Sequence, residues 1–250
     1  MSVAGGSVTW PASYREWAPP RALRPMLTCL WSSTVPAAGA PPTLVLPDGC
    51  ADLIWRTNGE AFIAGPDTGP VVSRLPPGTV LVGARFGPGA AGAGFGIGLD
   101  ELRDQRVSLA AVMPRVACQL RGVRQPAAAV KELTEIAGQL AITRPPDPLV
   151  REAARRLADP RVRVEALAGQ LGLSDRQLRR RCQAAAGYGP KTLQRVLRFR
   201  RFVARVDGGA RDLARIAQEA GYADQAHLTR ECAQLAGLSP TVLARARTVS

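Results

Sequence analysis

The feature that most constrains this 250-residue chain is a helical plan that occurs twice near its C-terminal end. In residues 164–186, apolar side chains recur at three- and four-residue spacing, a glycine follows, and a second amphipathic segment begins. Ser174 and Gln177 have the spacing of a capping box, which starts a helix. Residues 213–236 repeat the plan, with a glycine as the stop and Asp224 as the next cap. Two helices joined by a short turn with glycine form a helix-turn-helix unit, so the sequence predicts two such units.

The second helix of each unit leaves polar side chains on its outer face. The candidates for contact with DNA are Arg176, Gln177, Arg179, Arg180, Gln225, His227, Thr229 and Arg230. A helix in this position enters the major groove and reads base edges near its N-terminus, and the planar guanidinium of arginine suits guanine and phosphate. A merely solvated helix face is the alternative. The position of these residues after a capped turn favours DNA.

A further helix is predicted between the two units, beginning at Pro190 and ending at residues 207–209. About 17 residues span about 25 Å at 1.5 Å each. This length suits two recognition helices about 34 Å apart in successive turns of the major groove.

The distribution of charge supports the same interpretation. The net charge is +13, and residues 147–250 carry 20 basic and 10 acidic side chains, which is most of the excess. A concentrated positive field attracts polyanions. The charge by itself does not distinguish DNA from RNA or from an acidic membrane.

The first 125 residues contain short apolar runs separated by turn residues. Residues 43–55, 61–65 and 79–86 are the clearest predicted strands, and 47–49 (Pro-Asp-Gly) is a typical turn. Residues 87–98, rich in Gly and Ala, are expected to form a loop or a close backbone crossing. Many short strands with regular turns indicate a sandwich or a barrel.

From Pro126 the apolar residues return to helical spacing, until a proline-rich segment at 143–148 breaks the pattern. We therefore predict a two-domain α+β chain. Its N-terminal domain (1–142) is a β-barrel or cupin-like domain with a following helix, for regulation or dimerisation. A linker (143–147) leads to an all-α domain (148–250) with two helix-turn-helix units joined by a helix.

Three segments resemble the DNA-binding domain of AraC/XylS-type transcription regulators: GLSDRQLRRRCQAAAGYGP, VLRFRRF and IAQEAGYADQAHLTRECAQLAGLSP. The resemblance covers about residues 148–247 and implies a bacterial regulator that binds double-stranded DNA. The resemblance implies base contacts from Arg176, Arg179, Arg180, Gln225, His227 and Arg230. It also favours an activator over a repressor. Cys182 and Cys232 stand where the family has large aromatic residues, and Ala233-Gln234 replaces a basic pair.

The N-terminal segments YREWAPP, CLW, LPDGCADLIW, AGPDT and LPPG are similar to an uncharacterised domain that precedes such DNA-binding domains. This resemblance implies a regulatory or dimerising β-barrel. The candidate lining of a pocket for a small anionic effector is Trp31, Trp55, Arg85 and Phe86, and the alternative is that these aromatic residues belong to the core. RNA polymerase, the effector and a second copy of the chain are further candidate partners.

The sequence gives little support to catalysis. His227 is the only histidine, so the N-terminal segment has no histidine for a metal site or for a Ser-His or Cys-His pair. We predict no catalytic residue, metal site or cofactor, and no enzyme; the alternative is a small-molecule-binding protein or enzyme with an appended helical domain. Cys29 and Cys50 are either buried thiols or a redox or metal sensor. With no secretion signal or long apolar run, we expect a cytoplasmic protein without a membrane partner.

Overall fold

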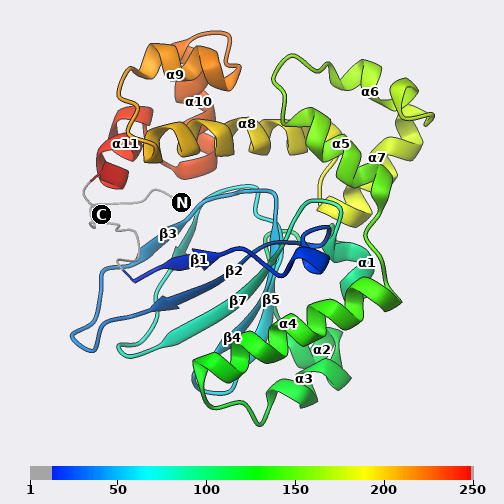
Figure 1. Cartoon of the computed structure of the whole chain (residues 1–250). Helices are drawn as coiled ribbons and strands as arrows, with labels where there is room; N and C mark the ends of the chain where they lie inside the picture. The colour runs from blue at the N-terminus through cyan, green and yellow to red at the C-terminus, as the bar shows by residue number, and fades with distance from the viewer. Residues whose placement is uncertain (1–12, 249–250) are drawn as a thin grey trace.

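The computed structural model describes residues 13–248 and has a sheet-rich N-terminal part followed by a helical C-terminal part (Figure 1). The expected two-domain fold is confirmed. The strands are β1 (Arg15–Trp17), β2 (Leu27–Thr34), β3 (Thr43–Val45), β4 (Ala51–Arg56), β5 (Ala61–Ala64), β6 (Val71–Ser73), β7 (Val80–Phe86) and β8 (Arg106–Ser108). The helices before the break are the 3-10 helix η1 (Arg21–Leu23), α1 (Ala91–Phe95), α2 (Leu109–Val112), α3 (Pro114–Leu120) and α4 (Pro126–Thr143).

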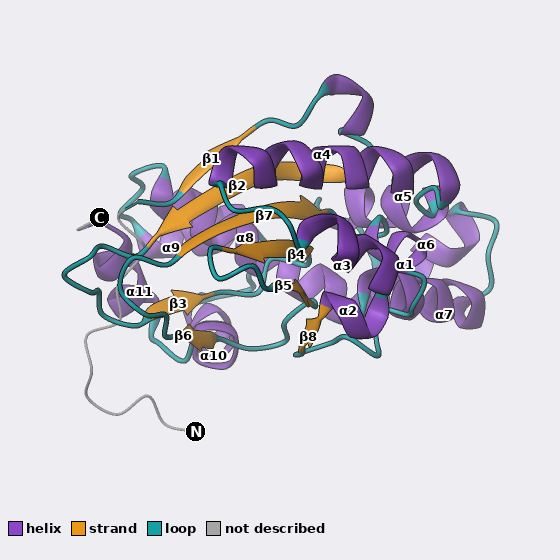
Figure 2. Ribbon diagram, turned by 90° about the horizontal axis from the view of Figure 1, so that it is seen from below, coloured by secondary structure: helices purple, strands orange, loops and turns teal. Residues whose placement is uncertain are grey.

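The N-terminal strands form two antiparallel sheets. Six strands lie in the order β1-β2-β7-β4-β5-β8, and β3 pairs with β6. Helix α4 packs across one face of the larger sheet, as Figure 2 shows from below. Its apolar stripe includes Leu133, Ile136 and Leu140, which pack with buried residues of the sheet in one core. The periodicity seen in the sequence is therefore the face that α4 turns to the strands.

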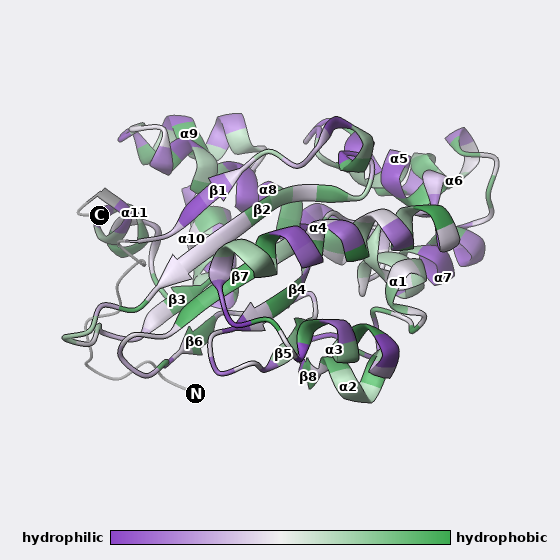
Figure 3. Cartoon of the chain, turned by 60° about the horizontal axis from the view of Figure 1, so that its bottom comes forward, coloured by the Kyte–Doolittle hydropathy of each residue, from purple (hydrophilic) through white to green (hydrophobic). Residues whose placement is uncertain are grey.

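The C-terminal part is all helical and has its own core. Its helices are α5 (Pro148–Leu157), α6 (Val164–Gln170), α7 (Asp175–Ala186), α8 (Pro190–Asp207), α9 (Leu213–Ala220), α10 (Gln225–Ala236) and α11 (Pro240–Thr248). Phe199 and Phe202 of α8 are fully buried at the centre, together with Cys182 and Cys232. The aromatic volume of this core thus comes from the long central helix, while the two cysteines fill the inward positions of α7 and α10. Figure 3 shows hydrophilic residues, in purple, along much of α5 and α7.

The chain crosses between the two parts at residues 144–147, between α4 and α5. The carboxylate of Asp147 accepts the backbone N–H groups of Leu149 and Val150 and so caps α5. This break coincides with the predicted linker, while the domain limits themselves stay a prediction. No helix among the described residues is long and apolar enough to cross a membrane.

Candidate nucleic-acid interface

Helices α6 and α7 form the first helix-turn-helix unit. Gly172 turns the chain between them with a φ of +67°, a conformation that favours glycine. Helix α7 starts with the predicted capping box: the Gln177 backbone N–H donates to Ser174 Oγ at 3.3 Å, and the Ser174 N–H donates to Gln177 Oε1 at 2.9 Å. Because its side-chain oxygen is used in this way, Gln177 helps to fix the start of α7.

The outer face of α7 is strongly basic. Its exposed arginines without an ion pair in the part of the chain that the structure describes are Arg176, Arg179 and Arg180. Arg181 differs, because its guanidinium pairs with the Asp147 carboxylate at 2.7 Å. The opposite face, with Leu178 and Cys182, is buried. Three adjacent cations near the start of an exposed helix can thus reach an anionic partner without breaking an existing pair.

Helices α9 and α10 form the second unit. The Asp224 carboxylate accepts the His227 backbone N–H at 2.6 Å and caps α10, as predicted. The half-buried His227 ring accepts the Ala223 N–H at Nδ1 (3.4 Å) and lies edge-on to Tyr222, with 5.2 Å between ring centroids. These contacts give His227 a packing role at the turn.

The other candidates on α10 are exposed. They are Gln225, Thr229 and Arg230. The Thr229 hydroxyl donates to the Gln225 carbonyl at 2.8 Å, one turn earlier. Arg230 has no ion pair among the described residues, so α10 presents one available cation where α7 presents three.

A partly buried ion pair attaches α10 to α8. Arg195 of α8 donates through Nε to Glu231 Oε1 at 2.6 Å and also donates to Gln234. This pair is not apparent in the sequence. Its members are 36 residues apart, and no local pattern links them.

The four residues proposed to line an effector pocket do not lie together, so the structure does not bring them into a single site. Trp55 and Phe86 are fully buried in the core beneath α4. Trp31 and Arg85 lie on the opposite face of the same sheet, where Trp31 belongs to a smaller cluster. Side chains alternate between the two faces of a strand, so the strand register separates the two pairs.

The surroundings of Arg85 are rich in carboxylates. Its guanidinium pairs with Glu16 at 3.0 Å, Asp52 at 3.2 Å and Asp48 at 3.4 Å. Burial raises the pKa of the Asp52 carboxyl, while Arg85 and the Trp31 N–H, which donates to it at 2.6 Å, lower that pKa. Three carboxylates around one guanidinium do not suit an anionic effector.

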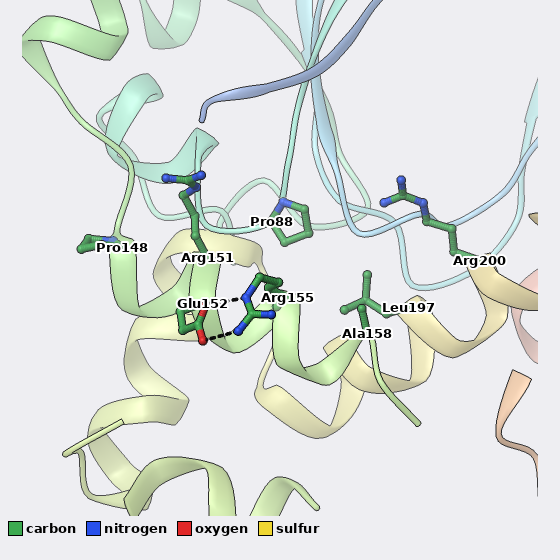
Figure 4. Close-up of a pocket in the computed structure, with 9 residues that line it drawn as sticks. Pro88, Pro148, Arg151, Glu152, Arg155, Ala158, Leu197 and Arg200 are labelled. Carbon is green, nitrogen blue, oxygen red and sulfur yellow. Dashed lines mark hydrogen bonds and ion pairs between the residues drawn. The ribbon is translucent and has the colours of Figure 1, made fainter. Parts of the chain in front are cut away.

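A basic pocket that the sequence analysis missed lies where the two parts of the chain meet (Figure 4). It has a volume of about 420 Å³ and lies between Pro88 and helices α5 and α8, with Arg151, Arg155 and Arg200 around it. Arg155 pairs with Glu152 at 2.7 Å, which partly neutralises its charge. The arginines of α5 and α8 can be seen in the sequence, but only the tertiary fold brings them to one pocket.

The cysteines are all free thiols, and Cys118 alone is exposed among the five. Burial raises the pKa of Cys29 to about 12 and that of Cys50 well above its usual value. Thiolates are the reactive form, so neither residue has the properties of an activated thiol. No group of three or more His, Cys, Asp or Glu side chains in residues 13–248 is arranged to hold a metal ion.

Two helix-turn-helix units with exposed cations on their second helices define a DNA-binding protein. Residues 167–246 match the family described as a helix-turn-helix domain, and residues 15–108 match a domain of unknown function, DUF6597. The C-terminal domain is an AraC-type helix-turn-helix domain, and such a domain supports a DNA-binding transcription regulator. No curated protein sequence is significantly similar to the whole chain.

A solved structure shares the fold at low identity. A crystal structure of ToxT from Vibrio cholerae O395 has 8% sequence identity and a TM-score of 0.50, and the match covers 88% of this chain and 98% of ToxT. A second ToxT structure, with an unsaturated fatty acid bound, has 9% identity and a TM-score of 0.45, and the match covers 99% of each chain. At this identity the likeness concerns the fold.

Proposed function

We propose that this chain binds a specific double-stranded DNA sequence through α7 and α10, which enter successive segments of the major groove. The observation that carries the proposal is the row of three exposed arginines in the first half of α7, which have no ion pair among the described residues and follow the capping box. Arginine donates two hydrogen bonds to guanine, and each good bidentate contact gives about 1–3 kcal/mol of discrimination.

The connecting helix α8 supports the proposed spacing. It has 18 residues, which corresponds to about 27 Å at 1.5 Å per residue. Recognition helices that read successive turns of one DNA face are about 34 Å apart. A rigid helix of this length therefore suits a target of two short elements about 10 base pairs apart.

The candidate residues divide into two roles under this proposal. Those that read or contact DNA are Arg176, Arg179, Arg180, Gln225, Thr229 and Arg230. Gln177 and His227 set the starts of their helices, because their side chains already bond to the turns. The first unit contributes more charge, so it dominates the dependence of binding on salt.

The test is a selection of DNA from a random library by the full chain, followed by affinity measurements with Arg180→Ala. The expected loss is about 1–3 kcal/mol on the selected site, with a smaller loss on random DNA. The matched control is Arg74→Ala, which removes an exposed arginine of the N-terminal domain. An equal loss of affinity on every DNA sequence would make Arg180 a phosphate contact. If the wild-type chain showed no preference for any DNA sequence, the proposed function would be rejected.

Activation is a further part of the proposal and comes from the family resemblance. A reporter gene downstream of the selected site distinguishes activation from repression: the proposal expects expression to rise when the chain is present. A fall would make the protein a repressor, and the DNA-binding proposal would stand.

A further inference from the structure

We propose that the N-terminal domain positions both recognition helices, and thereby sets the spacing of DNA elements that the protein reads. This inference rests on the DNA-binding function proposed above. Figures 1 and 2 show α1 of the N-terminal domain beside α7. The contacts at this point involve the end of α7 itself.

The N-terminal domain completes the C-terminal end of α7. The last carbonyl groups of a helix have no partner within the helix and need donors from elsewhere. The Leu99 N–H donates to the Ala184 carbonyl at 2.9 Å, and the Gly89 N–H donates to the Ala185 carbonyl at 3.1 Å. Arg103 donates from its guanidinium to the Gly187 carbonyl at 3.3 Å. A recognition helix is thus capped by residues about 80–100 positions earlier in the chain.

Glycines on both sides permit this close approach. A Cβ placed on Gly92 of α1 would lie 2.3 Å from the Ala184 carbonyl oxygen. A Cβ on Gly187, at the end of α7, would lie 2.3 Å from Pro66 Cγ, and the φ of Gly187 is +80°. Backbone and ring atoms cannot move aside as a flexible side chain can. The position of α7 against the N-terminal domain is therefore tightly defined.

The loop at residues 65–69 makes the second connection. The buried Tyr188 hydroxyl, just after α7, donates to the Asp67 carbonyl at 2.9 Å. The loop is itself held by a bidentate ion pair between the buried Asp67 carboxylate and Arg106, at 2.6 and 2.8 Å. The Thr68 N–H also donates to the Asp104 carboxylate at 2.6 Å. Because the loop is fixed at these points, a shift of the N-terminal domain would move the loop and the end of α7 with it.

The same loop also comes near α10. A Cβ on Gly69 would lie 3.7 Å from the carbonyl oxygen of Gln234, in the last turn of that helix. The ends of the two recognition helices therefore both lie beside one short loop, which bonds to the end of α7 through Tyr188, and they are also joined through α8. A change in the N-terminal domain at this loop alters the separation of the helices, and with it the preferred spacing of the DNA elements.

The test compares Gly92→Ala with Gly94→Ala in the full chain. Both glycines lie in α1, and neither has a positive φ. A Cβ on Gly94 would meet Leu140 at 3.8 Å, which is an ordinary contact, so Gly94→Ala is the matched control. Affinity is measured on the DNA selected by the wild-type chain and on versions whose two elements are one base pair closer or farther apart.

Gly92→Ala is expected to lower affinity about tenfold at the wild-type spacing and to shift or flatten the preference among spacings, because misplaced contacts cost about as much as a mismatched base pair. Gly94→Ala is expected to retain the wild-type profile. Hydrogen exchange at the Leu99 amide, which α7 protects, should become faster in Gly92→Ala, while amides of β7 keep their protection.

An unchanged spacing profile in Gly92→Ala would overturn the inference, whatever happens to the Leu99 amide. If Gly92→Ala does not fold, Tyr188→Phe replaces it, because this change removes the bond to Asp67 without adding volume. Tyr222→Phe is its control, since that buried hydroxyl has no hydrogen-bond partner among the described residues. A wild-type chain without sequence preference would instead refute the proposed function.

Discussion

We predict that Arg195→Met, which breaks the ion pair between α8 and α10, lowers the stability of the chain. The Glu231 side chain is 11% exposed and that of Arg195 33%, with 2.6 Å between Nε and Oε1. The second oxygen of Glu231 is buried and has no hydrogen-bond partner in the described part of the chain. Arg195→Met keeps most of the apolar stem and leaves a buried carboxylate without its cation.

The expected cost follows from the burial of the pair. Two unit charges 4 Å apart attract by about 4 kcal/mol at an effective dielectric of 20. Removal of one partner of a buried pair usually costs about 3–5 kcal/mol. Because Arg195 is one-third exposed, we expect the lower end, about 3 kcal/mol. For a chain of this length, each kcal/mol lowers Tm by about 2–4 °C, so Tm should fall by about 6–12 °C.

The assay is thermal unfolding of the full chain, followed by circular dichroism at neutral pH. The control is Lys191→Met, also on α8, because Lys191 pairs with Glu165 through side chains that are 77% and 69% exposed. Such a surface pair contributes about 0–1 kcal/mol. If Arg195→Met and Lys191→Met unfold within about 1 °C of each other, the burial argument is refuted.

A double variant identifies the cause of the loss. Replacement of both members, Arg195→Met with Glu231→Met, removes the unpaired charge and should recover much of the stability, since apolar substitutes for buried pairs are often neutral. A double variant as unstable as Arg195→Met alone would assign the loss to packing instead. The same comparison on DNA shows whether a loosened α10 weakens binding to the selected site.

Two further predictions concern titration. At pH 8 a thiol reagent should modify Cys118 much faster than Cys29, because burial raises the pKa of Cys29 to about 12 while Cys118 is exposed; mass spectrometry of the labelled chain checks this, and equal rates would contradict it. Hydrogen bonds from Arg155 and Arg156 lower the pKa of Glu152 from 4.5 to about 2, so its stabilising contribution is present above pH 4.5 and is lost as the pH falls toward 2. Carboxyl NMR at low salt should follow this titration, and a midpoint near 4.5 would show that the pairs do not persist in solution.

The helix-turn-helix units could be predicted from the sequence because their determinants are local. The cap at Ser174 and the cap at Asp224 each bond to a residue three positions later, and the apolar spacing gives the buried face directly. The same holds for α4 and for the end of α8 at Gly208. Short-range patterns of this kind depend little on residues that are distant in the sequence.

The faces of the sheet could not be predicted in the same way. Trp31 and Trp55 are both aromatic and both follow apolar residues, yet they point to opposite faces, because the register of β2 and β4 against β7 decides the orientation. Residues 87–98 are expected to form a loop or a close backbone crossing; residues 91–95 form the short helix α1, whose Gly92 lies close to the backbone of α7. In both cases the deciding partner is distant in the sequence.

The capping of α7 by the N-terminal domain has a consequence for how such proteins can diversify. Regulators with a separate sensor and reader are often regarded as modules that recombination can exchange. Here a hybrid with a foreign N-terminal domain would inherit an α7 whose Ala184, Ala185 and Gly187 carbonyls have lost their donors. An exchange of domains would therefore need a new N-terminal domain whose backbone and side chains place donors at the same three carbonyls.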